Sequence, residues 1–492
     1  MTREDVPATV AFDAVIAGNG VLGLSLGLEL VRQGARVAVL GAPSRRWAAT
    51  TASGAMLGCF GEATSALLGS APGRLKLELG IRAVSLWDGW LEGLRESADS
   101  DSEGLVTASD TVVLLNSVGT GDVDDRNFAS IHSALDQYAA PYDDIDPTDI
   151  AWLDPEPTAR PLRAVRIHGE RAVDSGLLLH LLEAAFVRAG GVLVPEPADR
   201  VEVRAGHAIG LVTESGELMR GADIVLAVGA RTDALLRSAP GVADGIPPIV
   251  SGMGVSALVR LRDRSDPGVV LRTPNRAFAC GLHLVPRGPG RVYLGATNIV
   301  TASAAERPTV RDAMFLLDCA TRQLRRDLTV GGLERINVGN RPVSVDGFPL
   351  LGPTAIAGLH LMTGTYRDGL TLSPLLASEF ARLLAGKPTE TDLSPFTPVR
   401  RPIQPFSRYE IVDTAVTHML ATGYENDWHI PVEWGPIIES NQRMVFTRLA
   451  DDIDAEFTPP PEILAASRAE PGLVTVLRRY YATCRALEGK PS

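Results

Sequence analysis

A glycine-rich turn close to the N-terminus leaves the start of this chain few ways to fold. The apolar run 12–17 (FDAVIA) precedes GNGVLG, an amphipathic segment LSLGLELVRQG, and a second apolar run, ARVAVL, at 35–40. This order predicts a strand, a tight turn, a helix and a second parallel strand, which together make one βαβ unit. A parallel sheet covered by helices is the architecture that such a unit opens.

The three glycines of the turn have separate tasks in this arrangement. Gly18 permits the tight bend, Gly20 lets the backbone approach a pyrophosphate, and Gly23 lets the helix pack closely against the strand. The helix that begins near Val21 would direct free N–H groups and the positive end of its dipole at the phosphates. A dinucleotide site is therefore predicted here.

One residue that usually accompanies this motif is missing. An acidic side chain after the second strand commonly accepts hydrogen bonds from the ribose hydroxyls, but VAVL is followed here by Gly41, Ala42 and Pro43. The ribose would then be held by backbone groups, by Ser44 or Arg45, or by water.

Bulk composition excludes several classes of protein. The chain has 492 residues, 45% of them hydrophobic and 22% charged, which suits a soluble globular protein of two or three structural units. A net charge of -12 argues against binding to nucleic acid. The N-terminus lacks a signal-peptide pattern and no run of about 18 apolar residues occurs, so we expect a cytoplasmic protein without a membrane span. The four cysteines lack ligand spacing, so we expect reduced thiols and no metal site.

The rest of the chain alternates between two kinds of pattern. Helical spacing is clear at 75–96, at 175–189 and at 309–325, whereas 246–300 has the pattern of antiparallel strands. From about residue 400 the sequence becomes aromatic and helical. We predict an α/β plus α+β fold: a Rossmann-like dinucleotide-binding domain, a mainly antiparallel substrate-binding domain and a C-terminal helical extension. The predicted boundaries are 1–75, 156–245 and 336–398 for the first domain, 76–155 and 246–335 for the second, and 399–492 for the extension.

Several ordered segments resemble the glycine oxidase branch of the D-amino acid oxidase superfamily over residues 12–390. They are the βαβ unit, TTASGAMLG (50–58), RAVDSGLLLHLLEAAFVRAGGVLV, ADIVLAVGA, GLHLVPRGPGRVYLGAT, and NRPVSVDGFPLLGP followed by TGTYRDGLTLSP. The resemblance implies an FAD cofactor, with 50–58 running beneath the flavin ring. It implies that FAD is contacted by Gly18, Gly20, Val21, Gly23, Thr50, Thr51, Ser53, Gly54, Met56, Val201, Gly229, Ala230, Gly364, Asp368, Gly369, Leu370 and Thr371, with the backbone of Val201 beside the adenine.

The same resemblance implies a substrate-binding set. Arg341 carries over as the arginine that binds the substrate carboxylate, because a planar guanidinium offers a two-pronged hydrogen bond. Arg367 carries over as a second arginine, although its neighbour Tyr366 could be the side chain that points inward; Arg341 itself could be a surface charge. His283 and Asn298 stand where the family has tyrosine and methionine, and His283 could bind a carboxylate or be an interior histidine.

The function implied is FAD-dependent oxidation of a C–N bond beside a carboxylate, with O2 as acceptor and H2O2 as product. The two altered pocket residues favour an N-substituted, N-carboxymethyl amino acid over plain glycine, giving glyoxylate and the free amine; enzymes of this kind act on N-carboxymethyl β-amino acids in macrolactam polyketide biosynthesis. If the extension forms a further pocket wall, an apolar N-substituent would be favoured. No catalytic base is required when the amine binds unprotonated. Alternatives are a glycine or D-amino acid oxidase or dehydrogenase of primary metabolism, and a flavoprotein scaffold that acts through its extension, in either case with homo-oligomers possible.

Overall fold

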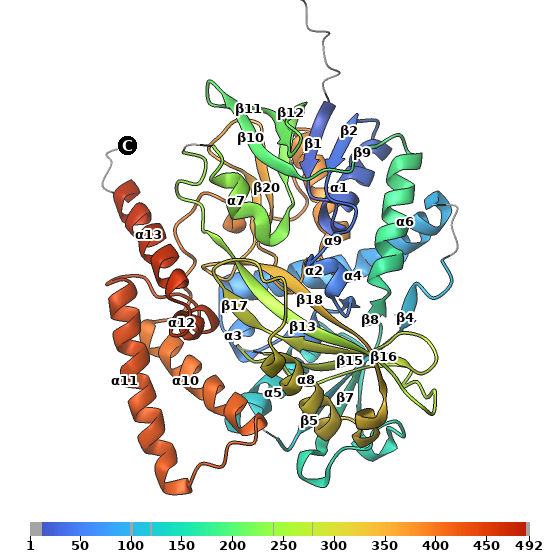
Figure 1. Ribbon diagram of the computed structural model, residues 1–492, viewed down its shortest axis with the longest axis vertical. Coiled ribbons are helices and arrows are strands. Elements are labelled where there is room, and N and C mark those ends of the chain that lie inside the picture. The colour runs from blue at the N-terminus through green and yellow to red at the C-terminus, as the bar shows by residue number, and fades with distance from the viewer. Residues whose placement is uncertain (1–11, 99–101, 119–120, 240, 278, 489–492) are drawn as a thin grey trace, which may run out of the picture.

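The computed structural model describes residues 12–98, 102–118, 121–239, 241–277 and 279–488. Two sheet-based parts lie one above the other, and the C-terminal helices run along one side of the lower part (Figure 1). The predicted α/β plus α+β class with a helical extension is confirmed.

The first part is an eight-stranded sheet that contains the predicted βαβ unit. Five parallel neighbours follow the order β20-β12-β1-β2-β9, and β10, β11 and β19 pair antiparallel at its margins. All four residues of β2 are buried, which explains its unbroken apolar sequence. The strands are β1 (Phe12–Ala17), β2 (Val37–Leu40), β9 (Val192–Val194), β10 (Ala198–Arg204), β11 (His207–Thr213), β12 (Leu218–Leu226), β19 (Leu350–Pro353) and β20 (Leu359–Thr363).

Helices cover both faces of this sheet. One face packs against four helices in the largest buried cluster of the described chain, and the other packs against the β10–β11 hairpin and a short helix. The long helix predicted at 75–96 lies outside the βαβ unit, as expected, and contacts the helices α6 (Ser175–Arg188) and α9 (Ser373–Leu384). The four helices are α1 (Val21–Arg32), α4 (Ala71–Ala98), α6 (Ser175–Arg188) and α9 (Ser373–Leu384), and the short one is α7 (Thr232–Leu236).

The second part is a nine-stranded sheet in the order β17-β13-β16-β15-β14-β5-β7-β6, with β18 also paired to β13. Its described pairings are antiparallel except that of β14 with β5. Helices α5 (Gly121–Gln137) and α8 (Val310–Gln323) each pack against one of two apolar clusters on it. The strands are β5 (Thr111–Asn116), β6 (Tyr142–Ile145), β7 (Pro161–Ile167), β13 (Ile249–Arg260), β14 (Val270–Arg272), β15 (Ala279–Pro286), β16 (Arg291–Thr297), β17 (Ile299–Thr301) and β18 (Gly332–Ser344).

Helix α5 corrects the sequence prediction, which found only one clear strand between residues 97 and 160. Asp and Ser residues hide its apolar stripe, but Phe128, Ile131 and Leu135 follow helical spacing and are fully buried. The remaining short elements are a small sheet of β3 (Met56–Leu57), β8 (Arg171–Val173) and β4 (Val106–Ala108) and the helices α2 (Ala49–Ala52) and α3 (Ser65–Leu68). Short 3-10 turns lie at Phe60–Glu62, Pro147–Asp149, Pro157–Ala159, Gly229–Arg231, Arg326–Val330, Ser394–Phe396 and Val432–Trp434.

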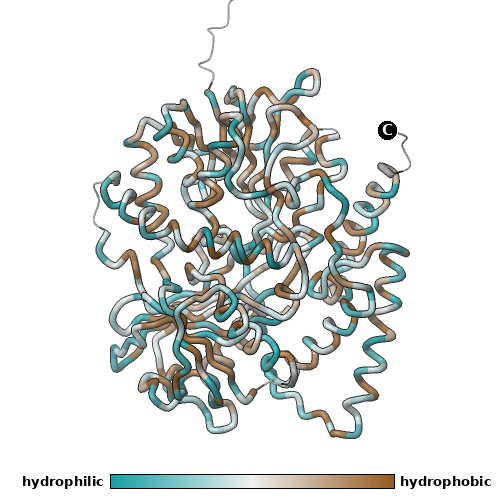
Figure 2. Tube along the Cα trace, turned by 180° about the vertical axis from the view of Figure 1, so that it is seen from behind, coloured by the Kyte–Doolittle hydropathy of each residue, from teal (hydrophilic) through white to brown (hydrophobic). Residues whose placement is uncertain are grey.

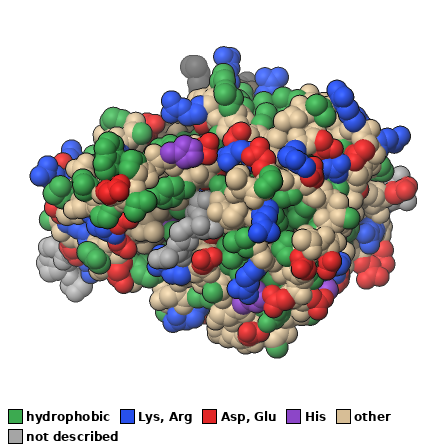
Figure 3. Space-filling view, turned by 90° about the horizontal axis from the view of Figure 1, so that it is seen from below, with side chains coloured by type: hydrophobic (Ala, Val, Ile, Leu, Met, Phe, Trp, Pro, Cys, Tyr) green, Lys and Arg blue, Asp and Glu red, His purple; other side chains and the backbone are tan. Residues whose placement is uncertain are grey.

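The extension is a set of four helices that packs on the second part. Hydrophobic and hydrophilic residues alternate along them (Figure 2), and their apolar stripes share one buried cluster with residues of β13, β17 and β18, including Val250, Val300 and Val343. Several large apolar side chains stay exposed on this lobe, at the left of Figure 3, among them Val432, Trp434 and Ile437. The helices are α10 (Arg408–Glu425), α11 (Gly435–Ile453), α12 (Pro461–Ser467) and α13 (Pro471–Glu488).

Within the described part of the chain, no helix is both long and apolar enough to cross a membrane.

Candidate active site

A cavity of about 890 Å³, here called the first cavity, connects the two sheet-based parts. One end, the nucleotide end, is lined by the turn after β1 and by residues before and within β10. The other, the arginine end, is lined by side chains of β15, β16 and β18 and by the loop after β20.

The glycine turn at the nucleotide end is built for a pyrophosphate. Gly18 has φ +111°, and a Cβ there would lie 2.4 Å from the carbonyl oxygen of Ala227. A Cβ on Gly23 would lie 1.8 Å from the carbonyl oxygen of Gly18. Helix α1 has Gly20 as its N-cap, no side-chain cap and no acidic residue in its first turn. Its free N–H groups and its dipole can therefore receive a phosphate, so these residues fit a dinucleotide.

Asn19 explains the missing acidic residue. The Asn19 Nδ2 donates to the carbonyl oxygen of Ala42 at 3.0 Å, and this bond fixes the orientation of the amide. A Cβ on Gly41 would lie 2.4 Å from Asn19 Oδ1, so the amide fills the space of a side chain at position 41. Arg45, considered for the ribose, instead donates from Nε to the Asn19 carbonyl at 2.8 Å and pairs with Glu183. Asn19 lines the first cavity beside Gly41, so it is a candidate for the ribose contact that the sequence motif did not indicate.

Val201, whose backbone was predicted to lie beside the adenine, is placed behind the cavity lining. Its side chain is buried in the apolar cluster, its N–H donates to Ser238 Oγ at 3.1 Å, and it does not line the first cavity. Pro197, Ala198 and Asp199, at the start of the same segment, line the cavity instead. On the opposite side, Gly229 and Ala230 both line the cavity.

The loop expected beneath the flavin lines the middle of the cavity. Thr50, Ser53, Gly54 and Met56 face it, whereas Thr51 does not and its hydroxyl donates to a carbonyl of its own turn.

Backbone strain gathers around this cavity. Of the eight non-glycine residues in the described chain with positive φ, four line the first cavity, namely Arg45, Trp47, Ala55 and Tyr366. Such conformations cost energy in non-glycine residues and cluster at functional sites. Their concentration here is a second reason to regard this cavity as the working site.

The segment after β20 brings several predicted residues to the cavity. Of the predicted residues, Asp368, Gly369, Leu370 and Thr371 line the first cavity, and Gly364 does not; its φ of +70° instead makes the bend that leads into them. The segment is held by three contacts: Lys76 pairs with Asp368 at 2.9 Å, Trp87 Nε1 donates to the Thr371 carbonyl at 2.9 Å, and Thr371 Oγ1 donates to the Met56 carbonyl at 3.3 Å.

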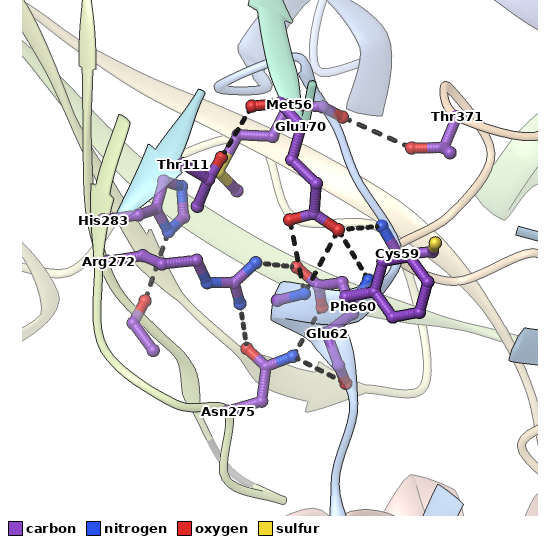
Figure 4. A network of polar contacts seen from close by, with 12 residues as sticks. Met56, Cys59, Phe60, Glu62, Thr111, Glu170, Arg272, Asn275, His283 and Thr371 are labelled. Atoms are coloured by element: carbon purple, nitrogen blue, oxygen red, sulfur yellow. Dashed lines mark hydrogen bonds and ion pairs between the residues drawn. The ribbon is translucent and has the colours of Figure 1, made fainter. Parts of the chain in front are cut away.

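A buried carboxylate anchors the end of the flavin loop (Figure 4). Glu170 Oε1 accepts from the backbone N–H groups of Cys59 and Phe60 at 2.7 and 2.6 Å, and Gly61 donates to it at 3.3 Å. Burial raises the pKa of Glu170, while Arg272 and these N–H groups oppose that shift. The carboxylate closes the turn that follows Met56 and so fixes the floor of the cavity.

A second buried cluster adjoins it. Arg272 donates to Glu62 Oε1 at 2.6 Å and to Asn275 Oδ1 at 2.8 Å, and Asn275 Nδ2 donates to Glu62 Oε2 at 2.5 Å. Burial would raise the pKa of Glu62, but Arg272 and Arg367 outweigh it and bring the pKa to about 2. Glu62 is thus an anion that lines the cavity. These residues were missed because Arg272 and Glu62 are 210 positions apart.

Arg341 lies at the arginine end, on β18, opposite Gly252 of β13. A Cβ on Gly254 would lie 2.6 Å from Arg341 Nη2, so the guanidinium lies over a glycine. Its Nη1 donates to the carbonyls of Thr297 and Gly252 at 3.2 and 3.4 Å and to Asn298 Oδ1 at 3.4 Å. In the described chain, no carboxylate lies within ion-pair distance of Arg341.

His283 and Asn298 occupy different positions. His283 lines the cavity, stacks on Tyr293 with centroids 5.8 Å apart, and has Nδ1 3.2 Å from the Gly281 carbonyl. Burial, aided by the charge of Arg272, lowers the pKa of His283 to about 3, so the ring is neutral at physiological pH and offers no charge to a substrate. Asn298 does not line the cavity.

Asn298 lies behind the cavity wall. Its Nδ2 donates to the hydroxyl of Tyr366 and its Oδ1 accepts from Arg341. Both Tyr366 and Arg367 line the cavity, with the Arg367 guanidinium 4.9 Å from the centre of the Tyr366 ring. The structure thus brings the two arginines into one cavity, with Asn298 as a support of Arg341 and Tyr366.

A second cavity of about 460 Å³ adjoins the first and shares Tyr366, Arg367 and Asp368 with it. The extension forms one wall, from Thr414, Thr417 and other residues of α10. The remaining lining mixes apolar and polar side chains of the two sheet-based parts, among them Leu67, Leu77, Val123, Lys76 and Asn127.

Comparisons with known proteins agree with this geometry. Residues 13–383 match the family described as DAO, FAD dependent oxidoreductase. Glycine oxidase of Geobacillus kaustophilus is 27% identical over 395 residues, which span 80% of this chain and 98% of that protein. Its crystal structure superposes with a TM-score of 0.67 over 80% of this chain and all of the other. Iminodiacetate oxidase of Chelativorans sp. BNC1, 21% identical, shares the fold with a TM-score of 0.66 over 78% of this chain and 98% of its own.

The family match covers well over half of the chain, and it includes the glycine turn and both arginines. The chain therefore belongs to the DAO family of FAD-dependent oxidoreductases and is related to glycine oxidase.

Proposed function

We propose that this enzyme oxidises the C–N bond of a glycine unit whose nitrogen carries a substituent, as in an N-carboxymethyl amino acid. The products are glyoxylate and the free amine, with O2 reduced to H2O2. Sequence similarity to a glycine oxidase and the shared fold with an iminodiacetate oxidase support this choice.

The environment of Arg341 is the observation that carries the proposal. A guanidinium that lines a cavity and has no carboxylate partner among the described residues is a site for an anionic ligand. Three acceptors hold one of its nitrogens, so the remaining N–H groups have a fixed direction. A substrate carboxylate fits this chemistry.

Bound FAD supplies a two-electron acceptor for the hydride of the substrate α carbon. The chain's part is positioning: Arg341 holds the carboxylate so that the α C–H bond has one orientation in the cavity. Loss of the hydride and of the N–H proton leaves a C=N bond, and water adds to that carbon and releases the amine. His283 is neutral at physiological pH, so it adds no positive charge beside the two arginines.

The second cavity supports an N-substituent. It lies beside the first, is bounded by Arg367 and is partly formed by the extension. A group attached to the amine nitrogen could extend into it, where apolar side chains and polar groups both line the wall. Plain glycine would leave this space unused.

Product analysis tests the proposal. The purified holoenzyme is incubated with glycine, sarcosine, iminodiacetate and longer N-carboxymethyl amino acids, and products are identified by mass spectrometry with peroxide detection. Glyoxylate plus peroxide from the N-substituted compounds, at a higher kcat/KM than from glycine, is the expected result. Faster turnover of glycine or of D-amino acids would assign the enzyme to those substrates, and turnover without peroxide would make it a dehydrogenase.

Acid precipitation is a companion test for the attachment of FAD. We expect the yellow colour in the supernatant, since burial holds the pKa of the nearby Cys59 thiol well above its ordinary value and disfavours the reactive thiolate. Colour in the pellet would indicate a covalent bond and make Cys59 the first residue to examine.

A further inference from the structure

Helix α10 of the extension holds one loop of the second part, residues 275–277. The Ala277 N–H donates to His418 Nδ1 at 2.8 Å. The Arg276 guanidinium donates to Glu425 Oε2 at 2.5 Å and to both oxygens of Asp124 at 2.7 and 2.5 Å. His418 and Glu425 both belong to α10, so the extension binds this loop at two points.

The same loop supports the arginine end of the first cavity. Its Arg276 carbonyl accepts from Arg367 Nη2 at 3.3 Å, and its Ala277 carbonyl accepts from Asn298 Nδ2 at 3.5 Å. Asn298 in turn accepts from Arg341. The loop therefore stands between the extension and the side chains that face the substrate carboxylate.

The ion pairs of Arg276 are rigid because the side chains that form them are buried. Side chains of Arg276, Asp124 and Glu425 are between 5% and 8% exposed, and a buried ion pair that loses one partner is strongly destabilised. Glu425 is fixed further by Gln323, which donates to its Oε1 at 2.8 Å, and by Arg322, which donates to its carbonyl at 2.7 Å.

His418 is suited to accept a hydrogen bond. Burial, with the nearby charges of Arg276 and Arg126, lowers the pKa of His418 to about 3, so the ring is neutral at physiological pH. Because Nδ1 accepts from Ala277, the ring proton is on Nε2.

The extension lies beyond the segment that the family shares, which ends at residue 383. We propose that His418 and Glu425 are positioning residues for the oxidation: through loop 275–277 they hold Arg367 and Asn298, and so Arg341, in the geometry that binds the substrate carboxylate. The extension is then part of the substrate site of this enzyme. This inference rests on the proposed function, because it assigns the arginines to a carboxylate.

Full-length holoenzyme variants test the inference. His418→Ala removes the acceptor of a buried N–H, whereas His418→Asn offers Oδ1 near the position of Nδ1. Arg443→Gln is the matched control, because Arg443 pairs with Asp413 and Glu439 of the extension and does not contact the loop. The readouts are kcat, KM, FAD content, and the dissociation constant of glycolate, a small carboxylate, measured from the flavin spectrum.

We expect His418→Ala to raise both KM and the glycolate dissociation constant about tenfold, because carboxylate binding is weakened equally in the ground state and the transition state. FAD content and kcat should stay nearly unchanged. His418→Asn should recover most of this loss, and Arg443→Gln should match wild type. Equal values for His418→Ala and Arg443→Gln would overturn the inference, as would failure of His418→Asn to recover binding.

Glu425→Gln keeps an acceptor without the charge and tests the same contacts with loop 275–277 if His418→Ala does not fold. Wild-type affinity of Glu425→Gln for glycolate would count against the inference. The two proposals fail differently. A wild-type enzyme that turns over no amine refutes the proposed function, while the glycolate measurement still shows whether the extension controls carboxylate binding.

Discussion

The two ends of the first cavity are built from different parts of the chain. At the nucleotide end the lining is mostly backbone, with Gly18, Gly20 and the N–H groups of α1 within one short turn. At the arginine end the lining includes the two arginines, and each of these is held by a neighbour far away in sequence, Arg341 by Asn298 and Arg367 by the Arg276 carbonyl.

This difference predicts how the two ends respond to change. A backbone site is intolerant of added atoms, because a Cβ meets main chain that cannot move aside. A side-chain site tolerates added atoms better but depends on supports that can be loosened from a distance. Both ends lie within the segment that matches the family, and near the second end the extension contacts loop 275–277.

The largest expected effect breaks the backbone end. Gly23→Ala places a Cβ 1.8 Å from the Gly18 carbonyl oxygen, so the turn or the helix must shift, and we expect protein without FAD or no folded protein. Gly89→Ala is the control, because Gly89 also lies in a helix but is exposed, with open space where its Cβ would be. FAD content and thermal melting decide the matter, and a yellow, stable Gly23→Ala protein would show that the turn is not rigid.

Arg341→Lys tests the side-chain end. An ammonium cannot reproduce the two-pronged contact with a carboxylate, so we expect kcat/KM to fall by a factor that corresponds to about 2–4 kcal/mol, with little loss of stability. Stopped-flow flavin reduction measures the effect. A reduction rate and substrate affinity equal to wild type would remove Arg341 from the site.

The same difference between local and distant contacts decides which elements could be predicted from the sequence. The βαβ unit, α6 and the extension were predicted because glycine spacing and helical periodicity are local signals. Helix α5 was missed because polar and charged residues outnumber the apolar ones in its sequence, although Phe128, Ile131 and Leu135 hold helical spacing.

The candidate site divides in the same way. Motif residues such as Gly18 and Gly229 line the cavity where expected, since each follows a predicted strand. Glu170 and its partner Cys59 lie 111 positions apart, and no local pattern marks them as partners. Val201 illustrates a further limit: its strand was predicted correctly, but its side chain is buried, and Pro197, Ala198 and Asp199 line the cavity.

A smaller effect is expected at the ribose. Asn19→Ala should weaken FAD binding by about 1 kcal/mol, roughly fivefold, through loss of one hydrogen-bonding group. The double variant Asn19→Ala/Gly41→Asp should recover affinity, because the acid then occupies the vacated space, whereas Gly41→Asp alone collides with Asn19. FAD titration of the apoprotein gives all three constants. An Asn19→Ala protein with wild-type affinity would leave the ribose to backbone or water.

A further expected effect, small as a change in melting temperature, is a pH dependence that arises at the arginine end. The pKa of His283 is lowered from 6.5 to about 3 by burial and by Arg272. Between these values the unfolded chain binds the proton and the folded chain does not, so the contribution of His283 to stability is complete above pH 6.5 and is lost as pH falls toward 3. The limit is about 1.4 kcal/mol per pH unit, which corresponds to a few degrees at most in melting temperature for a chain of this size.

His283→Gln removes this titration and supplies the comparison. Other groups also titrate in acid, Glu62 and Glu170 among them, so the informative quantity is the difference in melting temperature between wild type and His283→Gln at pH 7 and at pH 5. Wild type should lose more stability than the variant over that interval. Equal losses would mean that the His283 ring becomes charged in the folded enzyme. The arginine end would then be more open to water than its buried contacts indicate. The nucleotide end would be unaffected, because its glycine turn has no titrating group.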